Sequence, residues 1–232
     1  KGYVILGWTE TGLVNFYSKE PITSLETLQK AKMWSWSSDP LAKVMFDAFK
    51  INAVPLELTD VPMSLDTGII DGCYATPMAA LALQWAPRIK YITRQNMAYS
   101  TGALAIRKKI FDKMSAAHQK TVLEITRRYS REITAATRSE NMKALDEFKK
   151  DGKVFVDFDA EQAKEVIKKS RKIRKSLVGK FFSKSLHNEV IKSRNEFRKM
   201  DLEKLSRKDD NGSKALLKER KSFYAGSEED LI

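Results

Sequence analysis

Residues 33–85 alternate short apolar runs with helix-forming segments, and this alternation constrains the fold more than any other feature of the chain. The apolar runs at 33–36, 53–58 and 71–75 have the length of strands. Each is followed by a helix start signal: Asp39-Pro40, then Thr59 or Asp60 with Pro62, then Thr76-Pro77. Strands that alternate with helices favour a parallel sheet with crossover connections, so we predict an α/β fold.

The flanking segments add elements of both kinds. Residues 3–17 are expected to form two β segments separated by a glycine-containing turn, and the Thr23-x-x-Glu26 spacing predicts a capping box before a short helix. Residues 88–93 and 99–106 have strand character, the second apolar enough to be buried. A long helix should run from about residue 108 to 152 with a kink or break near 138–141, followed by a strand at 153–158 and two amphipathic helices.

Composition excludes several classes of protein. With 232 residues and 42% hydrophobic content, the chain can form a substantial core. The lone Cys73 cannot make an internal disulfide, and His118 and His187 offer no metal-ligand spacing. Neither G-x-S-x-G nor a phosphate-binding glycine motif occurs, so we predict no enzyme activity, no cofactor and no metal. No apolar run approaches the about 20 residues of a membrane-spanning helix.

The net charge of +12 could indicate nucleic-acid binding. However, the basic run at 164–175 lies opposite the apolar positions Val166, Ile167 and Ile173 of one helix, which favours a solvated helix face, and we expect no nucleic-acid partner. Residues 203–232 have no sustained apolar face and are expected to form a basic flexible tail.

Aromatic side chains gather at the ends of the expected strands. Trp34 and Trp36 share one face of a short strand, and Tyr74 lies at the matching end of another. Ligands in open α/β sheets bind beyond the carboxyl ends of strands. An apolar ligand-binding wall and an ordinary core are both compatible with this pattern.

Residues 18–85 resemble the substrate-binding subunit, of the DctP type, of TRAP (tripartite ATP-independent periplasmic) transporters. The segments that carry the resemblance are SKEPITSLETLQKAKMW and NAVPLELTDVPMSLDTGIIDGCYATPMAA, and SLVGKFFSKSLHNEVI resembles the C-terminal helices of that family. The residues in register with the family pattern are Pro21, Ile22, Leu28, Lys32, Pro55, Leu58, Asp60, Leu65, Thr67, Gly68, Asp71 and Gly72.

The resemblance implies a type II periplasmic-binding-protein-like, two-lobed fold with long C-terminal helices, in which the first lobe is incomplete because its N-terminal portion is lacking. Residues 1–31 would then form the hinge and a remnant of lobe one, 32–106 lobe two, and 107–202 helices and a short strand that return to lobe one. The implied location is periplasmic, with the signal segment outside this chain. We also expect that Lys1 follows a cut inside a larger protein.

The departures from the family pattern concern the ligand. Members of this family hold a solute carboxylate with two Arg side chains and an Asn, and register places Trp34, Val14 and Ala75 at those positions. An indole cannot neutralise a buried carboxylate. We therefore expect a hydrophobic cleft for an apolar or weakly polar solute, with Thr76 as a polar handle. The expected ligand-binding residues are Val14, Trp34, Trp36, Leu58, Tyr74, Ala75 and Thr76.

The resemblance also implies partners: a small-molecule solute and the TRAP membrane subunits, with a tetratricopeptide-repeat lipoprotein as a further candidate. The alternative function is a ligand-sensing binding protein that signals to a membrane partner without transport.

Overall fold

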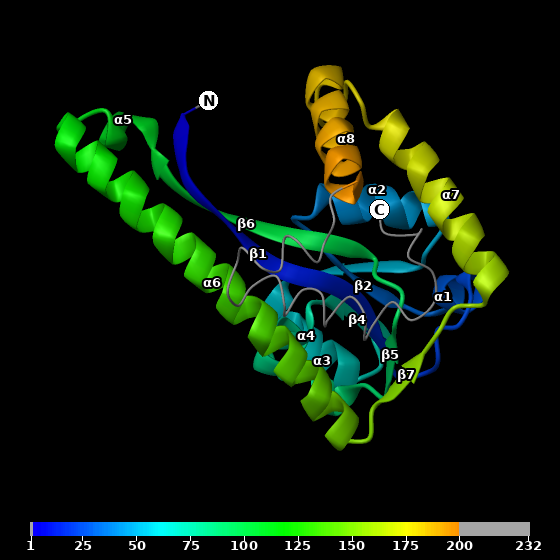
Figure 1. Ribbon diagram of the computed structural model, residues 1–232. Coiled ribbons are helices and arrows are strands. Elements are labelled where there is room, and N and C mark those ends of the chain that lie inside the picture. The colour runs from blue at the N-terminus through cyan, green and yellow to red at the C-terminus, as the bar shows by residue number, and fades with distance from the viewer. Residues whose placement is uncertain (1, 200–232) are drawn as a thin grey trace.

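The computed structural model describes residues 2–199. Its strands form one mixed sheet in the order β3-β2-β4-β1-β5-β7, and β6 pairs with a different stretch of β1 (Figure 1). The strands are β1 (Tyr3–Ser18), β2 (Met33–Trp36), β3 (Ala53–Leu56), β4 (Gly72–Ala75), β5 (Tyr91–Thr93), β6 (Ala98–Arg107) and β7 (Val154–Val156). β2 runs parallel to β3 and β4, which confirms the α/β prediction, whereas β1 runs antiparallel to β4, β5 and β6.

The helices begin close to the signals in the sequence. They are α1 (Leu25–Lys30), α2 (Pro40–Phe49), α3 (Val61–Asp66), α4 (Pro77–Ala82), α5 (Lys108–Phe111), α6 (Ala116–Lys150), α7 (Ala160–Ser176) and α8 (Lys184–Lys199), with single 3₁₀ turns at η1 (Leu58–Asp60) and η2 (Ala86–Arg88). Asp39 caps α2 by accepting from the backbone N–H groups of Leu41 and Ala42. Among the described residues, no helix combines the length and the apolar character needed to cross a bilayer.

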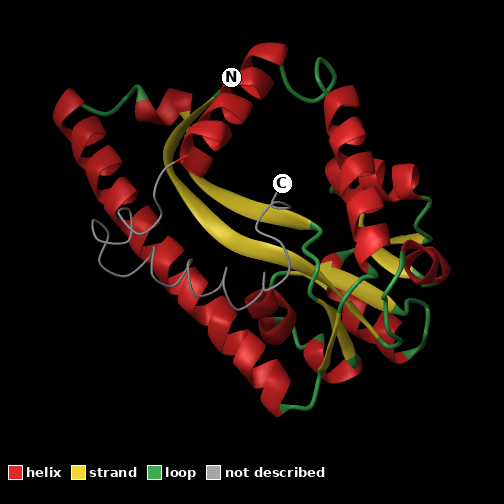
Figure 2. Cartoon of the chain, turned by 45° about the vertical axis from the view of Figure 1, so that its right-hand side comes forward, coloured by secondary structure: helices red, strands yellow, loops and turns green. Residues whose placement is uncertain are grey.

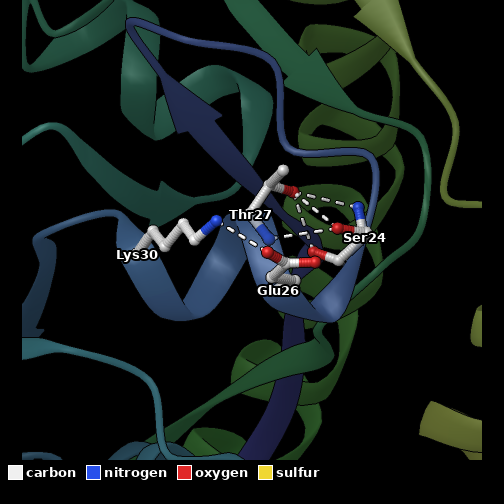
Figure 3. A network of polar contacts seen from close by, with 4 residues as sticks. All are labelled: Ser24, Glu26, Thr27 and Lys30. Atoms are coloured by element: carbon white, nitrogen blue, oxygen red, sulfur yellow. Dashed lines mark hydrogen bonds and ion pairs between the residues drawn. The ribbon is translucent and has the colours of Figure 1, made fainter.

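The cap of α1 differs from the expected Thr23–Glu26 box. The box is formed one residue later: the Ser24 hydroxyl accepts from the Thr27 N–H at 3.0 Å, and the Thr27 hydroxyl accepts from the Ser24 N–H at 3.0 Å (Figure 3). Glu26 instead forms a surface ion pair with Lys30 at 2.6 Å. A Thr at the third helical position can therefore take the place of the usual Glu or Gln, because its hydroxyl also accepts a hydrogen bond.

Residues 3–17 form one strand rather than two. β1 pairs with β6 along most of its length, and the register shifts at two bulges, between Ile5 and Gly7 and between Glu10 and Gly12. The resulting two-stranded ribbon extends beyond the rest of the sheet (Figure 1). The expectation that 99–106 is buried was therefore wrong: most of β6 is exposed, because among the described strands only β1 pairs with it.

The long helix is continuous where a kink or break was expected. α6 spans 35 residues and lies along β1 (Figure 1). The hydrophobic periodicity weakens near 138–141 because Arg138 and Asn141 direct polar groups at β1: Arg138 pairs with Glu10, and Asn141 bonds the Thr11 carbonyl. Polar contacts with the sheet interrupt the apolar stripe there without interrupting the helix.

Two core clusters lie on opposite faces of the sheet, with helices covering both (Figure 2). Successive residues of one strand point to opposite faces of the sheet, so they belong to different clusters. Trp34 packs with α3, α4 and the C-terminal half of α6, whereas Met33 packs with α1, α2 and α7. In β1, Tyr17 belongs to the same cluster as Trp34, and Phe16 belongs to the same cluster as Met33.

The strand expected at 153–158 lies beside β5, where β7 pairs in parallel through Tyr91–Val154, Ile92–Phe155 and Thr93–Val156. It therefore extends the same sheet that contains β2, β3 and β4, although residues 107–202 were expected to return to lobe one. The lobe boundaries themselves stay a prediction. The expected tail at 203–232 lies outside the described residues.

Candidate functional site

The carboxyl ends of β2, β3 and β4 meet at one edge of the sheet, because these three strands are parallel. Trp36 ends β2 and pairs with Leu56 at the end of β3, close to Leu58. Ala75 ends β4, and Thr76 begins the turn into α4. Crossover connections leave room for a ligand at such an edge. We call it the carboxyl edge.

Trp34 is buried behind the carboxyl edge, with only 2% of its surface exposed. Its ring stacks on Tyr74 with a centroid distance of 5.0 Å and meets Trp85 edge-on at 5.2 Å. Its indole N–H donates to the Leu56 carbonyl at 3.0 Å. The only polar atom of this side chain is therefore satisfied inside the protein, and Trp34 belongs to the core.

Tyr74 closes the gap between the ends of β2 and β4. In the described residues, the ladder between these strands consists of the Met33–Gly72 pair, and Tyr74 lies beyond it. Its hydroxyl accepts from the Trp36 N–H at 3.4 Å and lies 3.4 Å from a carboxylate oxygen of Asp39, to which it donates. Burial, opposed by the bond from Trp36 and reinforced by Asp39, raises the pKa of the Tyr74 phenol far above its usual value. Tyr74 is thus a neutral hydroxyl that ties the two strand ends together.

The structure brings the expected ligand-binding residues to this edge but exposes only some of them. Trp36 and Leu58 are exposed, by 41% and 36%, and Tyr74 is partly buried. The remaining members are buried: Val14, Trp34, Ala75 and Thr76. The period-2 alternation of the strand predicts that Trp34 and Trp36 lie on the same face. It does not predict that Tyr74 and Trp85 cover Trp34 and leave Trp36 exposed.

The chain segments that form the carboxyl edge contain no basic residues. Residues 33–42 and 51–87 contain no Lys, Arg or His, although the chain carries 42 Lys and Arg residues. Asp39, Glu57 and Asp60 follow the ends of β2 and β3. The sequence pattern predicts Asp39 and Asp60 only as helix-start residues and predicts no role for Glu57. The signal that could have identified this feature was the long interval without a cation in a basic chain.

The described residues hold no cluster of metal-ligating side chains. Cys73 lies in the core, and burial raises the pKa of its thiol far above the usual value, so the side chain behaves as a small hydrophobe. The exposed large side chains at the carboxyl edge, Trp36 and Leu58, are apolar.

Comparisons with known proteins show which family this chain matches. The family model for bacterial extracellular solute-binding protein, family 7, matches residues 1–183. A curated solute-binding protein from Verminephrobacter eiseniae is 23% identical over 158 residues, which are 68% of this chain and 47% of the relative. The chain therefore spans about half the length of that relative.

Two solved structures of a TRAP periplasmic solute-binding protein from Citrobacter koseri are also similar. One, with bound D-glucuronate, is 26% identical and has a TM-score of 0.67, and the match covers 77% of this chain and 58% of the other. The other, an open apo structure, is 24% identical with a TM-score of 0.72, and the match covers 84% and 64%. The alignment extends over more of this chain in the open structure.

Proposed function

The chain belongs to family 7 of the bacterial extracellular solute-binding proteins, and we propose that it is part of a receptor that captures a small organic solute outside the cytoplasm. The receptor delivers the solute to the membrane subunits of a TRAP transporter. The likeness to a TRAP periplasmic solute-binding protein supports this function, and it is a binding function rather than catalysis. Because the chain matches only part of each relative, this function is a proposal about the complete protein.

The proposed solute is apolar or weakly polar. The observation that carries this proposal is the absence of basic residues from the chain segments that form the carboxyl edge, together with the burial of Trp34 where the resemblance places an Arg. The Citrobacter koseri protein holds D-glucuronate, an acid. A buried carboxylate needs a cation or several hydrogen-bond donors close by. The segments that form the carboxyl edge carry the carboxylates of Asp39, Glu57 and Asp60 instead.

The exposed side chains define the proposed contacts. Trp36 and Leu58 form an apolar rim, and the Tyr74 ring lies behind it. Thr76, the expected polar handle, is buried behind this rim and does not cap its own helix. Trp34, Val14 and Ala75 act from the core, where they shape the floor of the site without reaching the solute.

Calorimetry on the complete polypeptide tests the solute class with pairs of ligands that differ only in charge. We expect indole-3-acetamide to bind at least 10-fold more tightly than indole-3-acetate, and D-glucuronamide to bind at least as tightly as D-glucuronate. Burial of a Leu side chain contributes about 1.5–3 kcal/mol, so Leu58→Ala should weaken binding of the amide by roughly 10-fold. Leu83→Ala is the matched control, because Leu83 is also 36% exposed but lies at the far end of α4.

Tighter binding of the acids than of their amides would contradict the proposal of an apolar solute. If D-glucuronate bound more tightly than its amide and Leu58→Ala bound it as well as wild type, recognition would have to rest on cations outside the carboxyl edge. Reconstitution with TRAP membrane subunits in vesicles tests the partner: uptake that requires both the receptor and the membrane subunits supports transport. Saturable solute binding without uptake would favour a sensing role.

A further inference from the structure

Asn141 links three elements at the back of the carboxyl edge. It lies on α6 and is 1% exposed. Its side-chain oxygen accepts from the Met78 N–H of α4 at 3.0 Å, and its amide nitrogen donates to the Thr11 carbonyl of β1 at 3.0 Å. One buried side chain therefore holds α6, α4 and β1 together.

Both partners of Asn141 are backbone groups that secondary structure leaves unpaired. Met78 is the second residue of α4, and first-turn N–H groups have no partner within a helix. The N-cap residue Thr76 makes no side-chain cap. Thr11 lies at the bulge between Glu10 and Gly12, where the ladder with β6 skips a residue. Buried backbone groups without partners are costly, so the contacts of Asn141 stabilise both places.

The backbone of β1 is shaped to admit this side chain. Gly12 has φ +114°, a conformation that L side chains rarely adopt, and a Cβ built on it would lie 2.5 Å from the Asn141 amide nitrogen. One turn earlier on α6, Arg138 pairs with Glu10 on the other side of the bulge. The bulge is thus held from α6 at two adjacent points.

We propose that Asn141 is a positioning residue of the solute site: it caps α4 from α6 in place of Thr76 and couples the carboxyl edge to α6. This inference rests on the proposed function, because it assigns Asn141 a role in that same site. If Thr76 capped α4 itself, its hydroxyl would point at the helix N–H groups. With Asn141 as the external cap, a shift of α6 along β1 moves the start of α4.

Three variants of the complete polypeptide separate positioning from plain stability. Asn141→Leu removes both hydrogen bonds at nearly constant volume. Asn141→Asp keeps an acceptor for Met78 but cannot donate to Thr11. Phe148→Leu is the control, because Phe148 is fully buried on the same helix, away from the α4 cap, so its truncation lowers stability without touching α4's first turn.

Hydrogen exchange and calorimetry distinguish the three variants. Hydrogen exchange should show at least 10-fold faster exchange of the Met78 amide in Asn141→Leu, but wild-type protection in Phe148→Leu. Calorimetry with indole-3-acetamide, well below the melting temperature, should show at least 10-fold weaker binding by Asn141→Leu, an intermediate affinity for Asn141→Asp, and wild-type affinity for Phe148→Leu.

Two outcomes would contradict the positioning role of Asn141. Unchanged protection at Met78 in Asn141→Leu would overturn it, whether or not a solute binds. A lower melting temperature with wild-type affinity in Asn141→Leu would reduce Asn141 to a structural residue. If wild type binds none of the four ligands, the proposed solute class fails, and the exchange experiment still decides whether Asn141 anchors α4.

Discussion

Trp34 and Tyr74 stack face to face across the ends of neighbouring strands, with ring centroids 5.0 Å apart and an interplanar angle of 27°. The pair fills the carboxyl edge between β2 and β4 with the protein's own side chains. A cationic side chain at position 34 would face the same aromatic surroundings, with Trp85 on its other side. The apolar surroundings of position 34 are therefore built from several residues.

The first prediction concerns the stability that Trp34 contributes. Trp34→Ala should lower the free energy of unfolding by about 3–5 kcal/mol, because it removes a large buried ring and leaves the Leu56 carbonyl without its donor. Trp34→Phe keeps an aromatic ring and should cost about half as much. Urea unfolding followed by far-UV circular dichroism measures both.

Trp36→Ala is the matched control, because this tryptophan lies two residues further along the same strand and is 41% exposed. Its cost should stay near 1 kcal/mol or below, as is usual for a partly exposed site. Equal losses for the two alanine variants would contradict the burial of Trp34.

The second prediction concerns the buried hydroxyl of Tyr17. This group has no hydrogen-bond partner within the described part of the chain. An unsatisfied buried hydroxyl costs about 1–3 kcal/mol, so Tyr17→Phe should raise the free energy of unfolding at pH 7 by about 1 kcal/mol. The ring contact with Phe148, edge-on at 5.9 Å, is kept in the variant. A loss of more than 1 kcal/mol would indicate a partner for the hydroxyl, such as a buried water.

The third prediction is alkaline destabilisation. Burial raises the pKa values of Tyr17 and Tyr74 well above the usual tyrosine value, so the folded protein retains protons that the unfolded chain releases above about pH 10. The unfolded state then binds fewer protons, and the free energy of unfolding falls as pH rises. This contribution is fully present below about pH 10 and is lost above it, by about 1.4 kcal/mol per pH unit for the fully buried Tyr17 and by less for the partly buried Tyr74, whose ionised form is screened by water. Urea unfolding between pH 8 and 11 should show this fall, and Tyr17→Phe should make it shallower above about pH 10. The buried Cys73 thiol, whose pKa is also raised by burial, adds a fall of the same sign that begins at about pH 8.5 and is unchanged in Tyr17→Phe.

Local signals in the sequence predicted much of the fold. Asp39 followed by Pro40 marked the start of α2, because capping and the fixed φ of proline depend only on adjacent residues. The same argument located the start of α4 at Pro77. The alternation of strands and helices sufficed for the parallel β2–β3–β4 unit.

Long-range contacts were beyond the same reasoning. The exposure of β6 depends on which strands pair with it, and the weak periodicity at Arg138 and Asn141 has its cause in β1, far away in the sequence. Similarly, Trp34 became core because Tyr74 and Trp85 converge on it from two later segments. A sequence pattern shows which residues share a face but not what covers that face.

The last prediction tests the close contact between β1 and α6 at Gly7. A Cβ built on Gly7 would lie 2.1 Å from the Ser130 hydroxyl oxygen and 3.0 Å from the Ser130 Cβ. Gly7→Ala should therefore lower the free energy of unfolding by about 1–3 kcal/mol through overpacking. Urea unfolding of the complete polypeptide measures this loss.

A double-mutant cycle assigns the cause of that loss. Ser130→Gly removes the clashing atoms and by itself should cost about 0.5 kcal/mol, the difference in helix propensity between Ser and Gly. If the clash with Ser130 sets the penalty, Gly7→Ala should cost at least 1 kcal/mol less in the Ser130→Gly background than in wild type. Additive losses would place the penalty elsewhere, at the Thr126 carbonyl 3.3 Å from the built Cβ. Because the Thr126 carbonyl belongs to the helix backbone, additivity would mean that the axis of α6, and not one side chain, sets the distance between the helix and β1.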